Sequence, residues 1–307
     1  MSTLKSFLYM SFCFFLVVPN VYAQQVGSPQ TIDLADRVEP APESVFTKFR
    51  EAGMQPVNHV LTETEKKKVS KAFAALPPLH QKILKEHLHS ISFMDNMPNT
   101  ALTSTLITSG TTKMFNITFR AEILNETISE WATWKENTCY IKSEDNEYEV
   151  IIDAGTLDAI VYVLLHEATH VVDAVLNIAP HPDDTDVLVP PTPFTANVWY
   201  KINTPVEKFI NPLLETTRFR SGKAIPISSA PNVYKALQET PFASLYSMAS
   251  WHEDLAEILT IYHLTANMNQ PYKILVKKNG TTVFTFQPFT NKRVVKRQSK
   301  LAVFYKL

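Results

Sequence analysis

A stretch near the middle of the chain carries two histidines and a glutamate in the order His-Glu-x-x-His. His166 and His170 are four residues apart, so on a helix both side chains project from one face and can reach a single Zn²⁺. Glu167 is turned by about 100° around the helix, which suits a base beside a zinc-activated water better than a third ligand. The expected cofactor is therefore Zn²⁺, held in part by these two imidazoles.

The residues around this motif, 156–178, predict one long buried helix. Apolar side chains occupy nearly every face of the stretch, which is typical of a helix inside a domain. Thr156 is the expected N-cap, Asp158 adds a carboxylate to the first turn, and Pro180 lies just beyond the last apolar residue. Burying imidazoles and a carboxylate without partners would be costly, and a metal ion supplies the partner.

A catalytic zinc site uses three protein ligands and a water molecule, so we expect a third ligand from a second helix. Residues 242–265 predict that helix, and they place Glu253 and Glu257 one turn apart on one face. One of these carboxylates could bind the metal while the other orients a ligand histidine. His252, which precedes Glu253, is an alternative third ligand.

The two motifs resemble the zinc-binding motifs of the gluzincin family of metallopeptidases, and especially of its lethal-factor-like members. The likeness covers about thirty residues in two patches. The patches are His166-Glu-Ala-Thr-His170-Val-Val-Asp173, and Tyr246 followed seven residues later by Glu253 and then by Asp-Leu-Ala-Glu257. The pattern lacks the third histidine of the metzincins, because Asp173 and Leu176 stand where that subclass has glycine and histidine.

This resemblance implies a zincin-like peptidase and a role for each motif residue. It makes Glu253 the third zinc ligand and Glu257 a carboxylate behind the ligands. It makes Tyr246 the hydroxyl that stabilises the oxyanion, and Asp173 a helix-face residue that supports the site. With Glu167 as general base, the expected function is hydrolysis of peptide bonds in a peptide or protein substrate. The alternatives are a secreted non-catalytic binding protein and a host-directed effector on the same scaffold.

The N-terminus has the pattern of a secretory signal peptide. A positive charge at Lys5 and an apolar run from Phe7 to Val18 precede Val21 and Ala23, which occupy the −3 and −1 positions, so cleavage is expected after Ala23. The run is too short to span a membrane, and no later stretch is long and charge-free enough. The mature chain is therefore expected to be secreted or periplasmic, without a transmembrane segment.

The remaining chain predicts an α+β fold with a zincin-like catalytic domain over residues 61–307. Residues 24–60 are polar and contain prolines, which predicts a flexible N-terminal arm. Residues 61–110 are the expected helical N-terminal part, marked by the capping box Thr62-Glu-Thr-Glu65. A small mixed sheet is expected to pack on the His-Glu helix, and the chain should end in a hairpin at Asn279-Gly280 and a basic helix. The strand-like segments are 90–94, 115–123, 138–141 and 148–152.

The net charge of −1 gives no argument for a nucleic-acid partner, and none is expected. The charge is uneven, because no Asp or Glu follows Glu257 while nine Lys or Arg lie between Lys273 and Lys306. This tail could face an anionic partner, although a solvated basic helix face also explains it. The mature chain keeps only Cys139, which excludes an intramolecular disulfide.

Three further expectations concern single segments. Residues 115–123 are the expected edge strand, to which an extended peptide could add. The loop 180–195 is expected to be an acidic surface turn, with His181 or Asp183 as alternative metal ligands. Three histidines around the second predicted helix are expected at or near the surface, namely His80, His87 and His89.

Overall fold

The computed structural model of the chain describes residues 33–106, 112–142, 144, 147–217, 219 and 223–306. Helices and strands are mixed along this part of the chain, so the fold class is α+β, as predicted. The predicted signal peptide, residues 1–23, lies outside the described residues. The same holds for residues 24–32 of the predicted arm.

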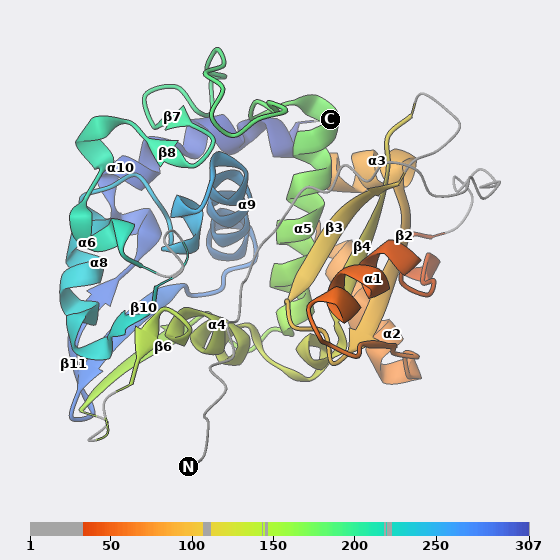
Figure 1. Cartoon of the computed structure of the whole chain (residues 1–307), viewed down its shortest axis with the longest axis horizontal. Coiled ribbons are helices and arrows are strands. Elements are labelled where there is room, and N and C mark those ends of the chain that lie inside the picture. The colour runs from red at the N-terminus through yellow and green to blue at the C-terminus, as the bar shows by residue number, and fades with distance from the viewer. Residues whose placement is uncertain are drawn as a thin grey trace.

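The helix α5 (Ala159–Leu176) carries the His-Glu motif and lies between a four-stranded sheet and the helix α9 (Trp251–Tyr262) (Figure 1). The sheet order is β1-β2-β4-β3, in which β2 and β4 are parallel and the other neighbours are antiparallel. Its strands are β1 (Val57–Asn58), β2 (Leu88–Asp95), β3 (Ala101–Leu106) and β4 (Met114–Arg120). A sheet therefore packs on the motif helix, as the sequence predicts.

The edge strands of this sheet are β1 and β3, and not the predicted segment 115–123. That segment forms β4, which lies between β2 and β3, so the prediction is wrong. β4 is buried along nearly its whole length, as a central strand must be. The sequence of β3, Ala-Leu-Thr-Ser-Thr-Leu, lacks the alternation of apolar and polar residues that would have marked it as a strand.

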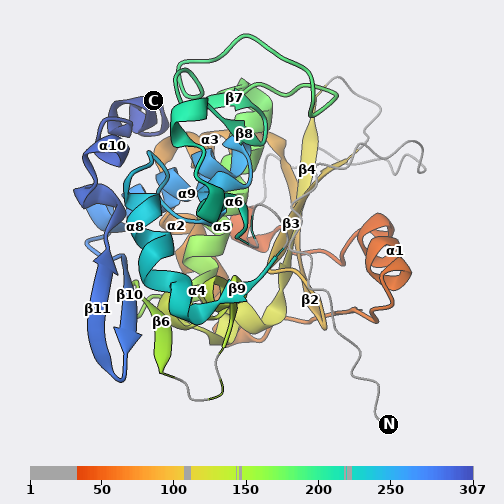
Figure 2. The ribbon, with the colours of Figure 1, turned by 60° about the vertical axis from the view of Figure 1, so that its left-hand side comes forward.

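A second sheet forms around the predicted C-terminal hairpin, on the other side of the helical centre (Figure 2). Asn279 and Gly280 adopt positive φ angles of 49° and 75°, which a two-residue hairpin turn requires. The segment 148–152 pairs with this hairpin and not with the first sheet, so the predicted strands do not form a single sheet. The strands are β6 (Tyr148–Asp153), β10 (Lys273–Lys278) and β11 (Thr281–Phe286), in the order β11-β10-β6.

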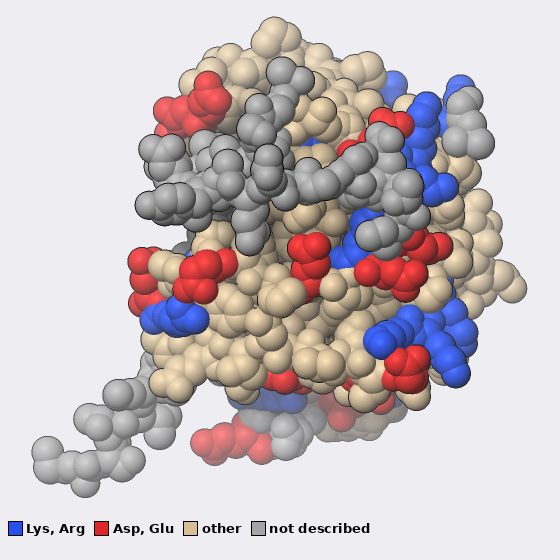
Figure 3. All heavy atoms as spheres, turned by 90° about the vertical axis from the view of Figure 1, so that its right-hand side faces the viewer, with Lys and Arg blue, Asp and Glu red and all other residues tan. Residues whose placement is uncertain are grey.

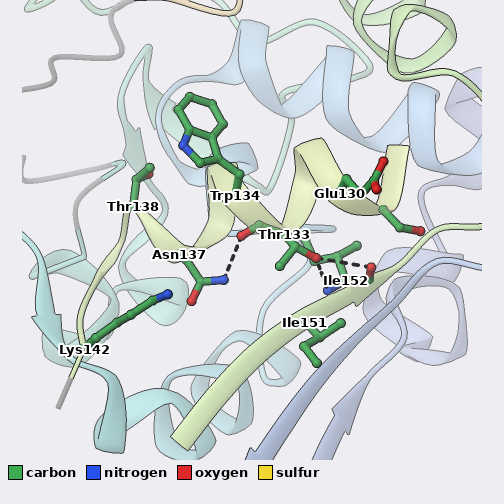
Figure 4. A pocket seen from close by; sticks show the side chains of 9 residues that line it. Glu130, Thr133, Trp134, Asn137, Thr138, Lys142, Ile151 and Ile152 are labelled. Atoms are coloured by element: carbon green, nitrogen blue, oxygen red, sulfur yellow. Dashed lines mark hydrogen bonds between the residues drawn. The ribbon is translucent and has the colours of Figure 1, made fainter. Parts of the chain in front are cut away.

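The helix α4 (Ile128–Asn137) covers the open edge of β6 (Figure 4). Thr133 Oγ1 accepts the backbone N–H of Ile152 at 2.9 Å, and Asn137 Nδ2 donates to the Val150 carbonyl at 2.8 Å. These side chains take up backbone groups that an unpaired edge would leave exposed. The contacts fix α4 against the sheet, which matters because another face of α4 reaches the candidate site.

Two helices directly precede β2, as predicted. Thr62 and Glu65 form the capping box of the first, with both reciprocal hydrogen bonds present. The helices end at His87, so the described rest of the predicted helical part, residues 88–106, consists of β2, β3 and the connection between them. The two helices are α2 (Glu63–Ala74) and α3 (Pro78–His87).

Much of the predicted flexible arm, residues 24–60, is folded. The helix α1 (Glu43–Glu51) buries one apolar face, and β1 joins the first sheet. The helix is short and starts without a side-chain cap, so its start signals are weak in the sequence. Its buried residues Val45, Phe46 and Phe49 pack in a small separate cluster with four others, namely Ala41, Met94, Met97 and Leu102.

The motif helix begins later than predicted. Asp158, not Thr156, is the N-cap of α5, and its side chain pairs with Lys68 Nζ at 2.8 Å and makes no cap bond. The helix ends at Asn177, whose φ of 51° is left-handed. Its 18 residues are apolar enough to cross a membrane, but 89% of that window is buried inside the protein, as expected for a core helix.

The remaining elements are short and connect the two sheets. Tyr140–Ile141 (β5) pairs with Ile225–Pro226 (β9), and Trp199–Lys201 (β7) pairs with Thr204–Pro205 (β8). The prediction of a strand at 138–141 is thus confirmed in part. The short helices in this region and at the C-terminus are α6 (Pro212–Glu215), α8 (Ala230–Gln238) and α10 (Lys292–Val295).

The basic C-terminal segment docks on the core. Arg297 donates two hydrogen bonds to the carboxylate of Asp254, at 2.8 and 2.6 Å, and both side chains are buried. Arg293 pairs with Glu239 at the surface. Part of the predicted basic tail is therefore paired within the chain. The apolar side chains of this segment face inward, Val294, Leu301 and Phe304 fully and Tyr305 in part.

The face of the molecule on the side of the four-stranded sheet carries acidic and basic side chains interspersed (Figure 3). Among the described atoms of this face, neither the acidic nor the basic side chains form a continuous patch. A nucleic-acid interface would need a basic stripe, and the described part of this face does not supply one.

His80 is not at the surface, so the prediction for this residue is wrong. Its side chain is fully buried, its Nε2 lies 3.0 Å from Thr169 Oγ1 on α5, and its ring stacks on Phe304. Burial lowers the pKa of His80 to about 3. The imidazole is therefore a neutral core group that links α3 to the motif helix.

This burial predicts a loss of stability in acid. The pKa of His80 is lower in the folded protein than its usual value of about 6.5. The contribution of the neutral imidazole to the free energy of unfolding is therefore complete above about pH 6.5, and it is lost as the pH falls toward about 3. Between pH 7 and 5 the wild type should lose roughly 2 kcal/mol more stability than His80→Gln. Urea unfolding at both pH values measures the difference, with His87→Gln as control. Parallel losses in wild type and His80→Gln would contradict it.

Candidate metal centre

The second motif lies on a helix whose start is well defined. Ser250 is the N-cap of α9, and its side chain accepts the backbone N–H of Glu253 at 3.2 Å. Glu253 therefore stands in the first turn, where its carboxylate points across to α5. The predicted helix 242–265 is shorter than expected, because Tyr246 lies on a separate 3-10 turn before Ser250.

The three predicted zinc ligands meet between α5 and α9. His166 Nε2 lies 3.0 Å from Glu253 Oε2 and 3.2 Å from His170 Nε2. The distance between His170 Nε2 and Glu253 Oε2 is 3.5 Å. Three ligands of one tetrahedral zinc, each about 2.0–2.2 Å from the metal, lie roughly 3.3–3.5 Å from one another. The two imidazoles and the carboxylate therefore fit a single zinc ion.

The electrostatics of these groups favour a cation. Burial alone would lower the pKa of His166, but hydrogen bonds to Glu253 and Glu257 raise it to about 9. Burial would raise the pKa of Glu253, but His170 and His166 hold it well below its usual range. The carboxylates thus create a field that favours positive charge at the imidazoles, and the same field favours a divalent ion.

Glu257 lies behind the ligand His166, one turn after Glu253. Its Oε1 is 3.2 Å from His166 Nδ1, and its Oε2 accepts the hydroxyl of Ser244 at 2.6 Å. A proton on His166 Nδ1 directed at this carboxylate leaves the Nε2 lone pair for a metal. The Glu257 carboxylate therefore lies where it could orient His166 as a metal ligand.

Glu167 is turned away from the two histidines, as its position on the helix predicts. Its Oε2 accepts the hydroxyl of Thr103 at 2.7 Å, and both side chains are buried. Thr103 belongs to the edge strand β3. The carboxylate that would act as base is therefore held beside the free edge of the first sheet.

Tyr246 packs on the ligand His166, with ring centroids 5.7 Å apart and planes inclined by 21°. Lys135, from α4, places its Nζ 3.7 Å from the centroid of the Tyr246 ring and 3.5 Å from Glu257 Oε1. Lys135 could not be recognised in the sequence because it is a single lysine on a helix without a motif. Thr103 was missed because its strand was not predicted.

Asp173, His181 and His252 form a second group whose donor atoms lie within 4.8 Å of one another. Its shortest contact, 2.6 Å between Asp173 Oδ2 and His252 Nδ1, is a hydrogen bond and is shorter than the roughly 3.3 Å between two zinc ligands. Trp251 Nε1, which can only donate, lies 3.0 Å from His252 Nε2 and 2.9 Å from the Pro180 carbonyl. The proton of His252 is therefore on Nδ1, and the group is a hydrogen-bonded tether.

This tether joins the two helices next to the ligands. Asp173 follows His170 by one turn on α5, and His252 immediately precedes Glu253 on α9. Asp173 also accepts the backbone N–H of Ala179 at 2.7 Å, which fixes the start of the predicted acidic loop. The geometry favours Glu253 over His252 as third ligand. His181 contacts Asp173, and Asp183 is exposed on the loop, as predicted for a surface turn.

No family model, curated protein or solved structure matches this chain. The interpretation of the site therefore depends on the residues themselves. The structure brings together all the residues of the two motifs: His166, Glu167, His170, Tyr246, Glu253 and Glu257 at the centre, and Asp173 beside it.

Metal binding distinguishes the role of Glu253 as a ligand from the role of His252 in the tether. Glu253→Gln should lower zinc affinity by at least about 100-fold because it removes a charged ligand. His252→Gln should keep one zinc per chain, since it alters only the tether. Metal analysis after dialysis against a competing chelator measures both. Zinc retained in Glu253→Gln and lost in His252→Gln would make His252 the ligand.

Proposed function

We propose that this chain is an exported zinc-dependent endopeptidase with a zincin-like catalytic domain. The observation that carries the proposal is the spacing of 3.0 to 3.5 Å among the donor atoms of His166, His170 and Glu253. A buried carboxylate, Glu167, stands next to this set on the same helix. Two imidazoles, one carboxylate and an adjacent carboxylate base make up the donor set of zinc peptidases that hydrolyse amide bonds.

Each residue of the site then has a chemical role. When bound, zinc would polarise the scissile carbonyl and acidify a water molecule. Glu167 accepts the proton of the attacking water and passes it to the leaving amine. Tyr246 donates a hydrogen bond to the oxyanion of the tetrahedral intermediate. Glu257 holds His166 by its Nδ1–H, which keeps the ligand nitrogen pointed at the metal.

The edge strand β3 is the proposed place for the substrate backbone. Arg120 donates its N–H to the carbonyl of Thr100, and bonded pairs alternate along an antiparallel ladder. The backbone groups of Thr103 and Thr105 therefore face away from β4. An extended peptide that adds to this edge would pass beside Glu167, because Thr103 already contacts that carboxylate.

Glu167→Gln should keep one zinc per chain and lose peptide hydrolysis by about 10²- to 10⁴-fold, because it removes only the base. Cleavage of casein and of a whole-proteome peptide library, read by mass spectrometry, measures the loss beside metal analysis. Glu122→Gln, which changes an exposed glutamate, is the control. Equal cleavage by wild type and Glu167→Gln would contradict the mechanism. A zinc-loaded wild type that cleaves nothing would favour the binding-protein alternative.

The substrate edge can be tested at Thr105, which is exposed and whose N–H faces away from β4. Thr105→Pro removes that N–H without breaking the ladder, whereas Thr105→Ala keeps it. The loss of one backbone hydrogen bond should raise KM up to about tenfold in the proline variant alone. Steady-state kinetics on one peptide measure the effect, with melting temperatures to confirm folding. Identical KM values in both variants would place the substrate elsewhere.

A further inference from the structure

Lys135 is a partly buried cation in contact with the candidate site. Its side chain is 16% exposed, and its Nζ lies 3.5 Å from Glu257 Oε1. Three aromatic rings surround the same ammonium, with centroids 3.7 Å away for Tyr246, 5.2 Å for Trp131 and 5.9 Å for Phe219. A cation held this way is attracted by the faces of the rings as well as by the carboxylate.

The helix that carries Lys135 is fixed from another side. Thr133 and Asn137 of α4 bind the backbone of β6 (Figure 4). Trp131 and Lys135 are one turn apart and so share a different face of α4. The helix that carries the Lys135 side chain therefore cannot shift without losing its hydrogen bonds to the edge strand β6 of the second sheet.

Lys135 contacts the two residues that support the ligand His166 from behind. Glu257 lies 3.2 Å from His166 Nδ1, and the Tyr246 ring stacks on the His166 ring. The ring of Tyr246 thus contacts both the ammonium of Lys135 and an imidazole that binds zinc in the proposed function. Phe219 closes this group, with its centroid 5.1 Å from that of Tyr246.

The charges of the site also require a cation at this place. Two buried carboxylates, those of Glu253 and Glu257, contact the imidazole of His166, and a third, that of Glu167, is buried beside Thr103. A divalent metal would leave one negative charge uncompensated, and the ammonium of Lys135 supplies the balance. Glu257 is the carboxylate that it contacts, and that carboxylate is only 2% exposed.

We propose that Lys135 is a positioning residue of this site, which holds the Tyr246 ring against His166 and keeps the Glu257 carboxylate on His166 Nδ1. The inference rests on the proposed function. Without the ammonium, the Tyr246 ring loses the contact on one face, and its hydroxyl is no longer fixed relative to the metal ligands. Small displacements of a group that acts in the transition state lower kcat more than they raise KM.

The test replaces the charge and keeps the length of the side chain. Lys135→Met should lower kcat on a peptide substrate by about 10- to 100-fold, with KM within about twofold of wild type and one zinc per chain. Lys135→Arg, which keeps the cation, should recover most of kcat. Lys68→Met, which removes a half-buried lysine that pairs with Asp158, is the matched control and should match wild type. An unchanged kcat in Lys135→Met would overturn the proposal.

A spectroscopic measurement tests the same inference without turnover. With 3-fluorotyrosine at position 246, the ¹⁹F signal of the zinc-loaded protein should shift in Lys135→Met and return in Lys135→Arg. An unchanged signal in Lys135→Met overturns the positioning role, whether or not the chain cleaves peptides. A shifted signal in a chain that cleaves nothing supports the positioning role and contradicts the proposed function. If Lys135→Met does not fold, Lys135→Gln carries the same two measurements.

Discussion

Several ionisable side chains are buried together where α5 meets α9. The rest of the structure depends on how these groups compensate one another's charges and hydrogen-bonding needs. His166 lies within hydrogen-bonding distance of Glu253 on one ring nitrogen and of Glu257 on the other. Each of these groups would be costly to bury alone. Together they form a set in which every carboxylate faces an imidazole, an ammonium or a hydroxyl. The arrangement tolerates, and electrostatically favours, a divalent cation at its centre.

The elements around this centre hold its two helices in one register. The hydrogen bond between Asp173 and His252 ties α5 to α9 one turn beyond the ligands. β3 reaches the centre through Thr103, and α4 reaches it through Lys135. Among the described residues, packing and these hydrogen bonds hold the two helices together, and the proposed zinc ion would add a further link between them.

Much of the centre could be predicted from the sequence because its main residues lie in two local patterns. The spacing of His166 and His170 fixes one face of one helix, and the interval between Glu253 and Glu257 fixes one face of another. Lys135 and Thr103 could not be predicted, since they reach the centre only through tertiary packing. The same reason explains the errors in the fold. The pairing of strands and the docking of α1 depend on contacts between distant segments, which no local pattern contains.

In the proposed function one zinc ion binds between α5 and α9. Anomalous diffraction at the zinc absorption edge, from crystals of the purified chain, locates such an ion. A single strong peak is expected at about 2.0–2.2 Å from a nitrogen of His166, a nitrogen of His170 and an oxygen of Glu253. A peak beside Asp173, His181 or His252 instead, or crystals of the folded, zinc-equilibrated chain without a peak at α5 and α9, would contradict it.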